Sequence, residues 1–142
     1  MTNNPASPDD VMLNKAGIIE RCLHRVAEEY ANDPTRLRDF TRQDAIILNL
    51  ERACQAAIDL AMRVVARDHL GIPQSSAHAF DLLSRSGRVT PDLAQTMHAM
   101  VGFRNVAVHQ YQTLKLDILQ RIVEESHTDL TAFCACLGLK IT

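Results

Sequence analysis

The run RNVAVHQY at residues 104–111 places a guanidinium, an amide, an imidazole and a phenol within one short stretch. At about 100° per residue, a helix through this run gathers the apolar residues before and within it on one arc. The members of the arc are Leu93, Met97, Met100, Val101, Ala107, Val108 and Tyr111. Arg104 falls in the middle of this arc, where an unpaired charge is costly. The expected helix therefore has a core face with a cation embedded in it.

A polar stripe runs down the neighbouring face of the same helix. It consists of His98, Gly102, Asn105 and His109, and its glycine would let another surface come close. On one regular helix Arg104 and His109 are about 140° apart in projection and about 7.5 Å apart along the axis, so they do not share a face. Two arrangements could bring them together. Either the helix breaks near His109, or a pocket is assembled from two copies of the helix across a two-fold axis.

Size and composition favour a single globular domain. A chain of 142 residues with 46% hydrophobic residues can bury one core, and residues 1–142 are expected to form it, with residues 1–8 frayed. The net charge of -2 argues against coating nucleic acid by bulk electrostatics, although a local basic site is compatible with it. The absence of Trp disfavours a base-stacking platform, so RNA contacts are expected through phosphate and ribose. No signal peptide or membrane-length apolar run is present, which favours a cytoplasmic protein.

The cysteines and histidines do not have the spacing of metal ligands. Cys22, Cys54, Cys134 and Cys136 are expected to be reduced thiols that are mostly buried, and the last two should point to different sides of a helix. No phosphate-binding loop or dinucleotide fingerprint occurs. We therefore expect neither a metal site nor a cofactor.

Helix signals recur along the whole chain, and no stretch shows sustained β alternation. The first helix is expected to start within the SPDD segment at residues 7–10 and to end at residues 32–34. The second should run from residue 41 or 42 to 70, and a short third from Ser75 or Ser76 to Ser84. The motif helix should open at residues 90–92 and run to about His109, and a last helix should span residues 114–137. This order predicts an all-α antiparallel helical bundle.

Two of these helices have faces that can be assigned in advance. The second helix has an apolar arc formed by Ile46, Leu50, Ala53, Ala57, Leu60, Ala61 and Val64. Its opposite side carries Arg52, Gln55, Asp59 and Arg63, which is either a solvated face with an ordinary Asp59–Arg63 pair or a surface that meets the motif helix across a dimer. The last helix is expected to turn inward Ile118, Leu119, Ile122, Val123, Leu130 and Phe133.

The pattern R-x4-H-x-Y in residues 104–111, with the lead-in MVGF at 100–103, resembles the signature of the HEPN superfamily. The segment GIP at 71–73, followed by Ser75, Ser76 and the helix at 79–83, is similar in order to the HepT-like toxins encoded beside a minimal nucleotidyltransferase antitoxin. The resemblance covers most of the chain. It implies a HEPN-fold homodimer with two-fold symmetry and a cleft between the protomers.

The resemblance also implies a function. The protein would be the toxin of a type II/VII-like toxin–antitoxin system and a metal-independent endoribonuclease with Arg104, His109 and Asn105 as catalytic residues. A histidine can move a proton at the ribose or the leaving oxygen, and an arginine can stabilise charge on the phosphoryl group. His98 and Gly102 are possible lining residues of the cleft. The antitoxin would neutralise the toxin by adenylylating Tyr111.

Several structural readings of the same residues remain open. Arg104 could be a core-edge arginine paired with a carboxylate, His109 a residue favoured at a helix end, and Tyr111 a half-buried packing residue. A rival function is a non-catalytic HEPN module that binds nucleotide or serves as a scaffold partner of a nucleotidyltransferase. The polar stripe could also do no more than fix the register of a helical dimer.

Overall fold

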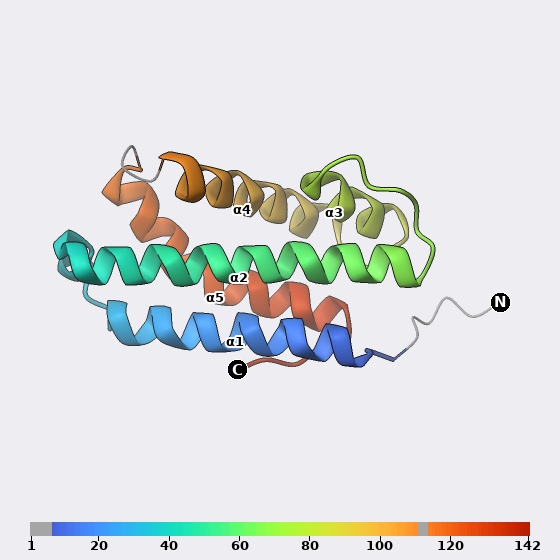
Figure 1. Ribbon diagram of the computed structural model, residues 1–142, viewed down its shortest axis with the longest axis horizontal. Helices are drawn as coiled ribbons and strands as arrows, with labels where there is room; N and C mark the ends of the chain where they lie inside the picture. Colours follow the sequence, from blue (N-terminus) through green and yellow to red (C-terminus); the bar gives the residue numbers. More distant parts are fainter. Residues whose placement is uncertain (1–6, 111–113) are drawn as a thin grey trace.

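The computed structural model describes residues 7–110 and 114–142, without the side chains of His109 and Gln110. Its elements, in chain order, are α1 Asp10–Tyr30, the 3-10 helix η1 Pro34–Arg38, α2 Phe40–Arg67, α3 Ser76–Arg85, α4 Pro91–Gln110 and α5 Leu116–Cys136 (Figure 1). No strand occurs in these ranges, so the prediction of an all-α fold is confirmed. None of the helices in the same ranges is both long enough and apolar enough to cross a membrane.

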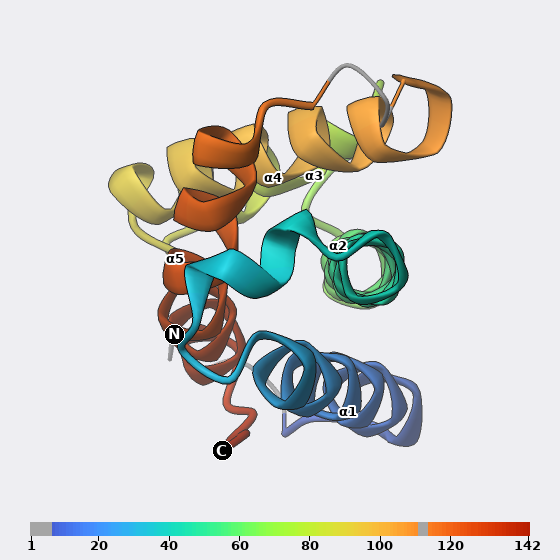
Figure 2. The ribbon, with the colours of Figure 1, turned by 90° about the vertical axis from the view of Figure 1, so that its left-hand side faces the viewer.

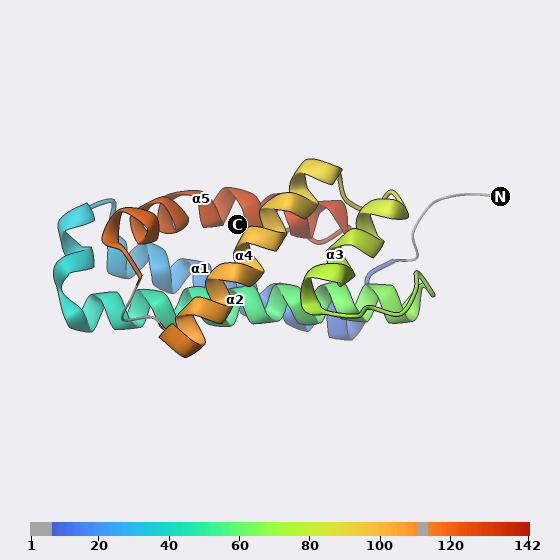
Figure 3. The same cartoon turned by 90° about the horizontal axis from the view of Figure 1, so that it is seen from above.

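The helices form a bundle in which α2 is the central member. α1 lies antiparallel beside α2, and α5 runs along both of them (Figures 1 and 2). α3 and α4 form a further layer over α2 and α5 (Figure 2). Seen from above, α4 crosses α2 obliquely, and its C-terminal end passes beyond the edge of α2 (Figure 3). This crossing carries the 104–110 part of the motif.

Local side-chain caps fix the starts of α1, α2, α3 and α4, whereas α5 begins after Lys115 without a side-chain cap; the caps at Ser75 and Thr90 were predicted. Ser75 Oγ accepts a hydrogen bond from the backbone N–H of His78 at 3.1 Å, and Thr90 Oγ1 accepts one from Leu93 at 3.1 Å. The cap of α1 is Asp9, whose carboxylate accepts from the Met12 N–H at 2.9 Å. Each cap satisfies an N–H group that has no partner within its own helix.

Two predicted boundaries were wrong. α1 ends at Tyr30 because Ala31 adopts the left-handed conformation, with φ of 49°, before residues 32–34 are reached. α2 ends at Arg67 rather than at residue 70, because His69 adopts the left-handed conformation, with φ of 53°, directly after the cap residue Asp68. Ser7 also contacts the bundle, since its backbone oxygen accepts from Arg67 Nη1 at 2.8 Å.

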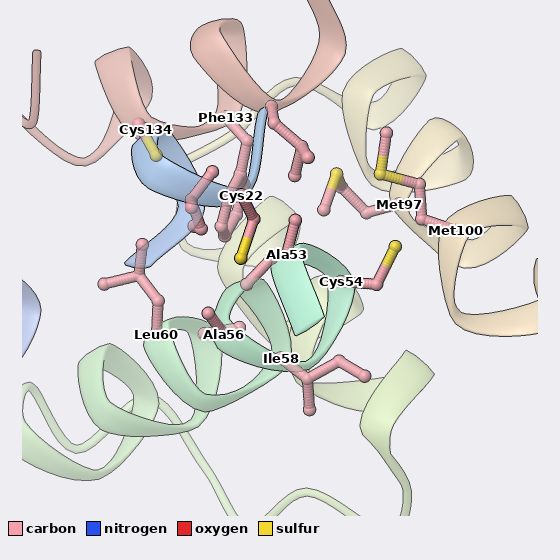
Figure 4. Packing of buried hydrophobic residues seen from close by; sticks show 14 of the residues in the cluster. Cys22, Ala53, Cys54, Ala56, Ile58, Leu60, Met97, Met100, Phe133 and Cys134 are labelled. Atoms are coloured by element: carbon pink, nitrogen blue, oxygen red, sulfur yellow. The ribbon is translucent and has the colours of Figure 1, made fainter. Parts of the chain in front are cut away.

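The core is formed by the apolar arc of α2 and the faces turned towards it. Every predicted member of that arc is buried, and the rings of Phe80 and Phe133 pack edge to face with centroids 5.4 Å apart. Figure 4 shows part of this packing around Cys22, Cys54 and Cys134, which are buried free thiols, while Cys136 is exposed. The cysteine prediction is confirmed. Burial is the main cause that raises the pKa of Cys54 and of Cys134 to about 12.

Two predicted core positions differ from the structure. Ile118 of α5 is 45% exposed, and Val108 of α4 is 43% exposed. Val108 belongs to the C-terminal end of α4, which passes beyond the edge of α2 in Figure 3, and Ile118 belongs to the first turn of α5. Both residues follow the apolar periodicity of their helices, but the described residues leave these two side chains exposed.

The polar side of α2 faces α1 and is not simply solvated. Asp59 pairs with Lys15 of α1 at 3.4 Å, and Arg63 Nη2 pairs with Asp9 at 2.8 Å. The predicted Asp59–Arg63 pair was therefore wrong, because both side chains find partners across the seam between the two helices.

Candidate functional site

Helix α4 holds the motif on a regular backbone. It starts with Pro91 after the Thr90 cap and stays helical through Gln110. The alternative in which the helix breaks near His109 is therefore wrong. The His109 side chain and all of Tyr111 lie outside the described residues, so the predicted roles of these two residues stay predictions.

Arg104 is half-buried and poorly partnered. Its Nη1 donates to the neighbouring Asn105 Oδ1 at 3.3 Å, and its Nε is buried without a hydrogen-bond partner among the described residues. No carboxylate of the described residues forms an ion pair with it. The alternative in which Arg104 is a core-edge arginine paired with a carboxylate therefore finds no support among the described residues. A buried donor left unpaired is costly, so the fold gives up stability to keep Arg104 in this position.

Near Arg104, the contact between α2 and α4 is formed by apolar and sulfur-containing side chains. Cys54 points from α2 towards Met97 and Met100 of α4 (Figure 4). Besides burial, the charge of Glu51 raises the pKa of this thiol and the charge of Arg104 lowers it. Both charged side chains therefore lie near Cys54, on the side of α2 that meets α4.

An open pocket of about 280 Å³ lies beside the last turns of α4. It is lined by Ala107 and by one face of α2, namely Asp44, Ile47, Leu48 and Glu51. Sequence reasoning did not single out the two acids. Their spacing with Ile47 and Leu48, at i, i+3, i+4 and i+7, is a signal for a shared face, but nothing in the sequence says that this face meets the motif helix.

The polar stripe of α4 divides into two parts. His98 Nε2 lies 2.8 Å from Asp81 Oδ1, so this histidine ties α4 to α3 within the chain. Gly102 and Asn105 are exposed, and a Cβ added to Gly102 would meet nothing within 4 Å. Gly102 also lines a groove of about 530 Å³ between α4 and α5, together with Phe103 and Val106. The stripe around Gly102 and Asn105 is thus open to another molecule.

Comparisons with known proteins agree with this arrangement. Residues 13–137 match the family model described as HepT-like, ribonuclease HepT-like. The mRNA nuclease HepT of Shewanella oneidensis MR-1 is 42% identical over 125 residues, which cover 88% of this chain and 94% of that protein. Among solved structures, a toxin–antitoxin with AMP-PNP has a TM-score of 0.87 at 39% identity. A tri-AMPylated Shewanella oneidensis HEPN toxin in complex with its MNT antitoxin also has a TM-score of 0.87, at 40% identity.

Each of these two structural matches covers 92% of this chain and 98% of the matched chain. The likeness therefore extends over the whole bundle and includes the helix that carries Arg104 and Asn105. The chain belongs to the HepT-like family of HEPN ribonucleases.

Proposed function

We propose that this protein is the toxin of a toxin–antitoxin pair and that it cleaves RNA without a metal ion. The observation that carries the proposal is Arg104, a half-buried guanidinium whose Nε has no partner among the described residues. A cation kept in this state on the motif helix suits an anionic ligand such as an RNA phosphate. The named relatives, an mRNA nuclease and a HEPN toxin, support the same conclusion.

The proposed reaction is attack by the ribose 2′-oxygen on the adjacent phosphorus. His109 takes the 2′-OH proton as the O2′–P bond forms, and a second imidazole returns a proton to the 5′-oxygen as the P–O5′ bond breaks. The products are a 2′,3′-cyclic phosphate and a 5′-hydroxyl. Arg104 stabilises the charge that develops on the phosphoryl oxygens, and Asn105, already in contact with Arg104 Nη1, orients the phosphate or the imidazole.

A homodimer would supply the second imidazole. Gly102 and Asn105 of α4 are exposed, and no described residue lies within 4 Å of a Cβ placed on Gly102, which supports contact with the same face of a second protomer. The two copies of the motif would then share one cleft. In this arrangement the two His109 side chains divide the roles of base and acid.

RNA incubated with the purified protein in EDTA tests the activity. Cleavage to fragments that end in a cyclic phosphate is the expected result. Stable nucleotide binding without cleavage would support the non-catalytic HEPN module and contradict the proposed enzyme.

The proposed antitoxin is a small nucleotidyltransferase that transfers AMP to Tyr111. An adenylate beside Arg104 would occupy the cation that an RNA phosphate needs and would fill the cleft. The AMPylated toxin among the solved relatives supports this mode of control. Incubation with the partner and ATP should add AMP to a peptide that contains Tyr111, as seen by mass spectrometry. A Tyr111→Phe protein that is still modified and silenced would refute the assignment.

A further inference from the structure

The seam between α1 and α2 is bordered by a row of ion pairs. Asp9 meets Arg63 at 2.8 Å, Lys15 meets Asp59 at 3.4 Å, and towards the other end Glu29 meets Arg42 at 3.6 Å. These pairs fix the antiparallel register of the two helices, which lie side by side in Figures 1 and 2. In this register Arg21 of α1 falls opposite Arg52 of α2.

The Arg21–Arg52 position is the exception in this row. Both side chains are exposed, and neither has a hydrogen bond or an ion pair with another described residue. Burial raises the pKa of the Cys22 thiol, and the charges of Arg52 and Arg21 lower it. Both guanidinia therefore lie near the same point of the seam. Like charges that face each other weaken helix packing, so the pairing has no structural advantage.

Gly17 of α1 leaves room beside the guanidinium of Arg21. A Cβ added to Gly17, one turn before Arg21, would lie 3.7 Å from Arg21 Nη1, so the glycine leaves this guanidinium beside bare backbone. On the other helix Arg52 directly follows Glu51, which lines the pocket beside Ala107 of the motif helix. Arg52 therefore lies about 100° around α2 from a residue that lines the pocket beside the motif helix.

We propose that Arg21 and Arg52 form a second phosphate-binding site, which holds the backbone of an RNA strand outside the catalytic cleft. The proposal rests on the proposed ribonuclease function. Two fixed guanidinium forks without carboxylate partners suit the oxygens of phosphodiesters, and the contact is independent of base sequence. A chain with a net charge of -2 needs such a local site to retain a polyanion.

The test compares RNA binding and cleavage by the full-length wild type and the double variant Arg21→Ala/Arg52→Ala. For a long single-stranded RNA, KM and Kd should rise about tenfold, and the slope of log Kd against log salt should fall by about 1.4, which is the loss of two phosphate contacts. The kcat at saturating RNA and the cleavage of a dinucleotide should not change. The variant Arg21→Lys/Arg52→Lys should retain most of the RNA binding.

The matched control is Arg25→Ala/Arg42→Ala, which removes the same charge from arginines of the same two helices that already pair with Glu28 and Glu29. An equal loss of RNA binding in this control would overturn the proposal in favour of bulk charge. Unchanged RNA binding in the Arg21/Arg52 double variant would also overturn it, including the case where only antitoxin binding is lost. A wild type that binds RNA but cleaves none would instead contradict the proposed ribonuclease function.

Discussion

Arg104 is held at a cost in stability that the fold itself does not explain. The residue lies on an apolar arc, its Nε is buried without a partner among the described residues, and its Nη1 donates a hydrogen bond to the neighbouring Asn105. Functional sites are the places where proteins keep such locally unfavourable groups. Its position was visible in the sequence because helical periodicity alone placed a charge within an apolar arc. The lack of a carboxylate partner could not be predicted from the sequence, because the partners of a side chain depend on tertiary packing.

A substitution of Arg104 should change the stability of the fold and the RNA cleavage activity in opposite directions. Arg104→Met keeps a long side chain and removes the unpaired buried donor, so the free energy of unfolding should rise by about 1 kcal/mol while RNA cleavage is lost. Urea unfolding followed by circular dichroism measures the first quantity, and cleavage of a labelled RNA measures the second. A clear loss of stability would instead identify Arg104 as a structural residue.

Among the helices, features set by the adjacent turn can be predicted from the sequence, whereas features set by packing against another helix cannot. The caps at Ser75 and Thr90 were predictable because a cap needs only the adjacent turn. The 3-10 helix at Pro34–Arg38 was missed because five residues are too few to show a period. The exposure of Val108 could not be predicted either, since it depends on where α2 stops covering α4.

The junction after α2 shows how one side chain can join two segments. Asp68 accepts hydrogen bonds from Arg67 Nε at 2.9 Å and from Arg88 Nη1 at 2.7 Å, and its side chain is only 12% exposed. It therefore joins the end of α2 to the loop that leads into the motif helix. Asp68→Asn should lower the free energy of unfolding by about 1–3 kcal/mol, because the charge that both arginines need is removed. Chemical denaturation at neutral pH measures the difference.

The same junction predicts a dependence on pH. The hydrogen bond from Arg67 is the largest cause that holds the pKa of Asp68 below its usual value. A carboxyl group with a lowered pKa in the folded state stabilises the protein above its unfolded pKa of about 4, and this contribution is lost as the pH falls through the folded value. The stability difference between the wild type and Asp68→Asn should therefore shrink in acid. A difference that stays constant down to pH values well below 4 would contradict the ion-pair account.

At the scale of the whole molecule, the open face of α4 is the feature that the single chain leaves unexplained. Gly102 lies within a helix, where glycine costs about 0.5–1 kcal/mol relative to alanine, and its surroundings in the chain would accommodate a Cβ. The stripe was recognised from sequence because it follows helical spacing. The partner of the stripe is expected to be a second protomer.

One alanine variant tests this expectation, and a second serves as its control. Gly102→Ala should weaken the dimer, because the added methyl group would lie in a close contact between protomers. Gly17→Ala is the matched control, since a Cβ there meets only Arg21 Nη1 at 3.7 Å. It should raise the stability of the fold by about 0.5–1 kcal/mol and leave the dimer intact. Analytical ultracentrifugation gives both dimer constants, and an unweakened dimer for Gly102→Ala would place the interface elsewhere.

The most direct test of the account is the rate of RNA cleavage in EDTA by wild-type protein, Arg104→Ala and His109→Ala, with the dimer mass of each protein measured in parallel. The catalytic role proposed for Arg104 and His109 predicts cleavage by the wild type and loss of cleavage by both variants, each still a folded dimer, because one side chain stabilises phosphoryl charge and the other moves the proton. Cleavage at the wild-type rate by both variants would contradict it.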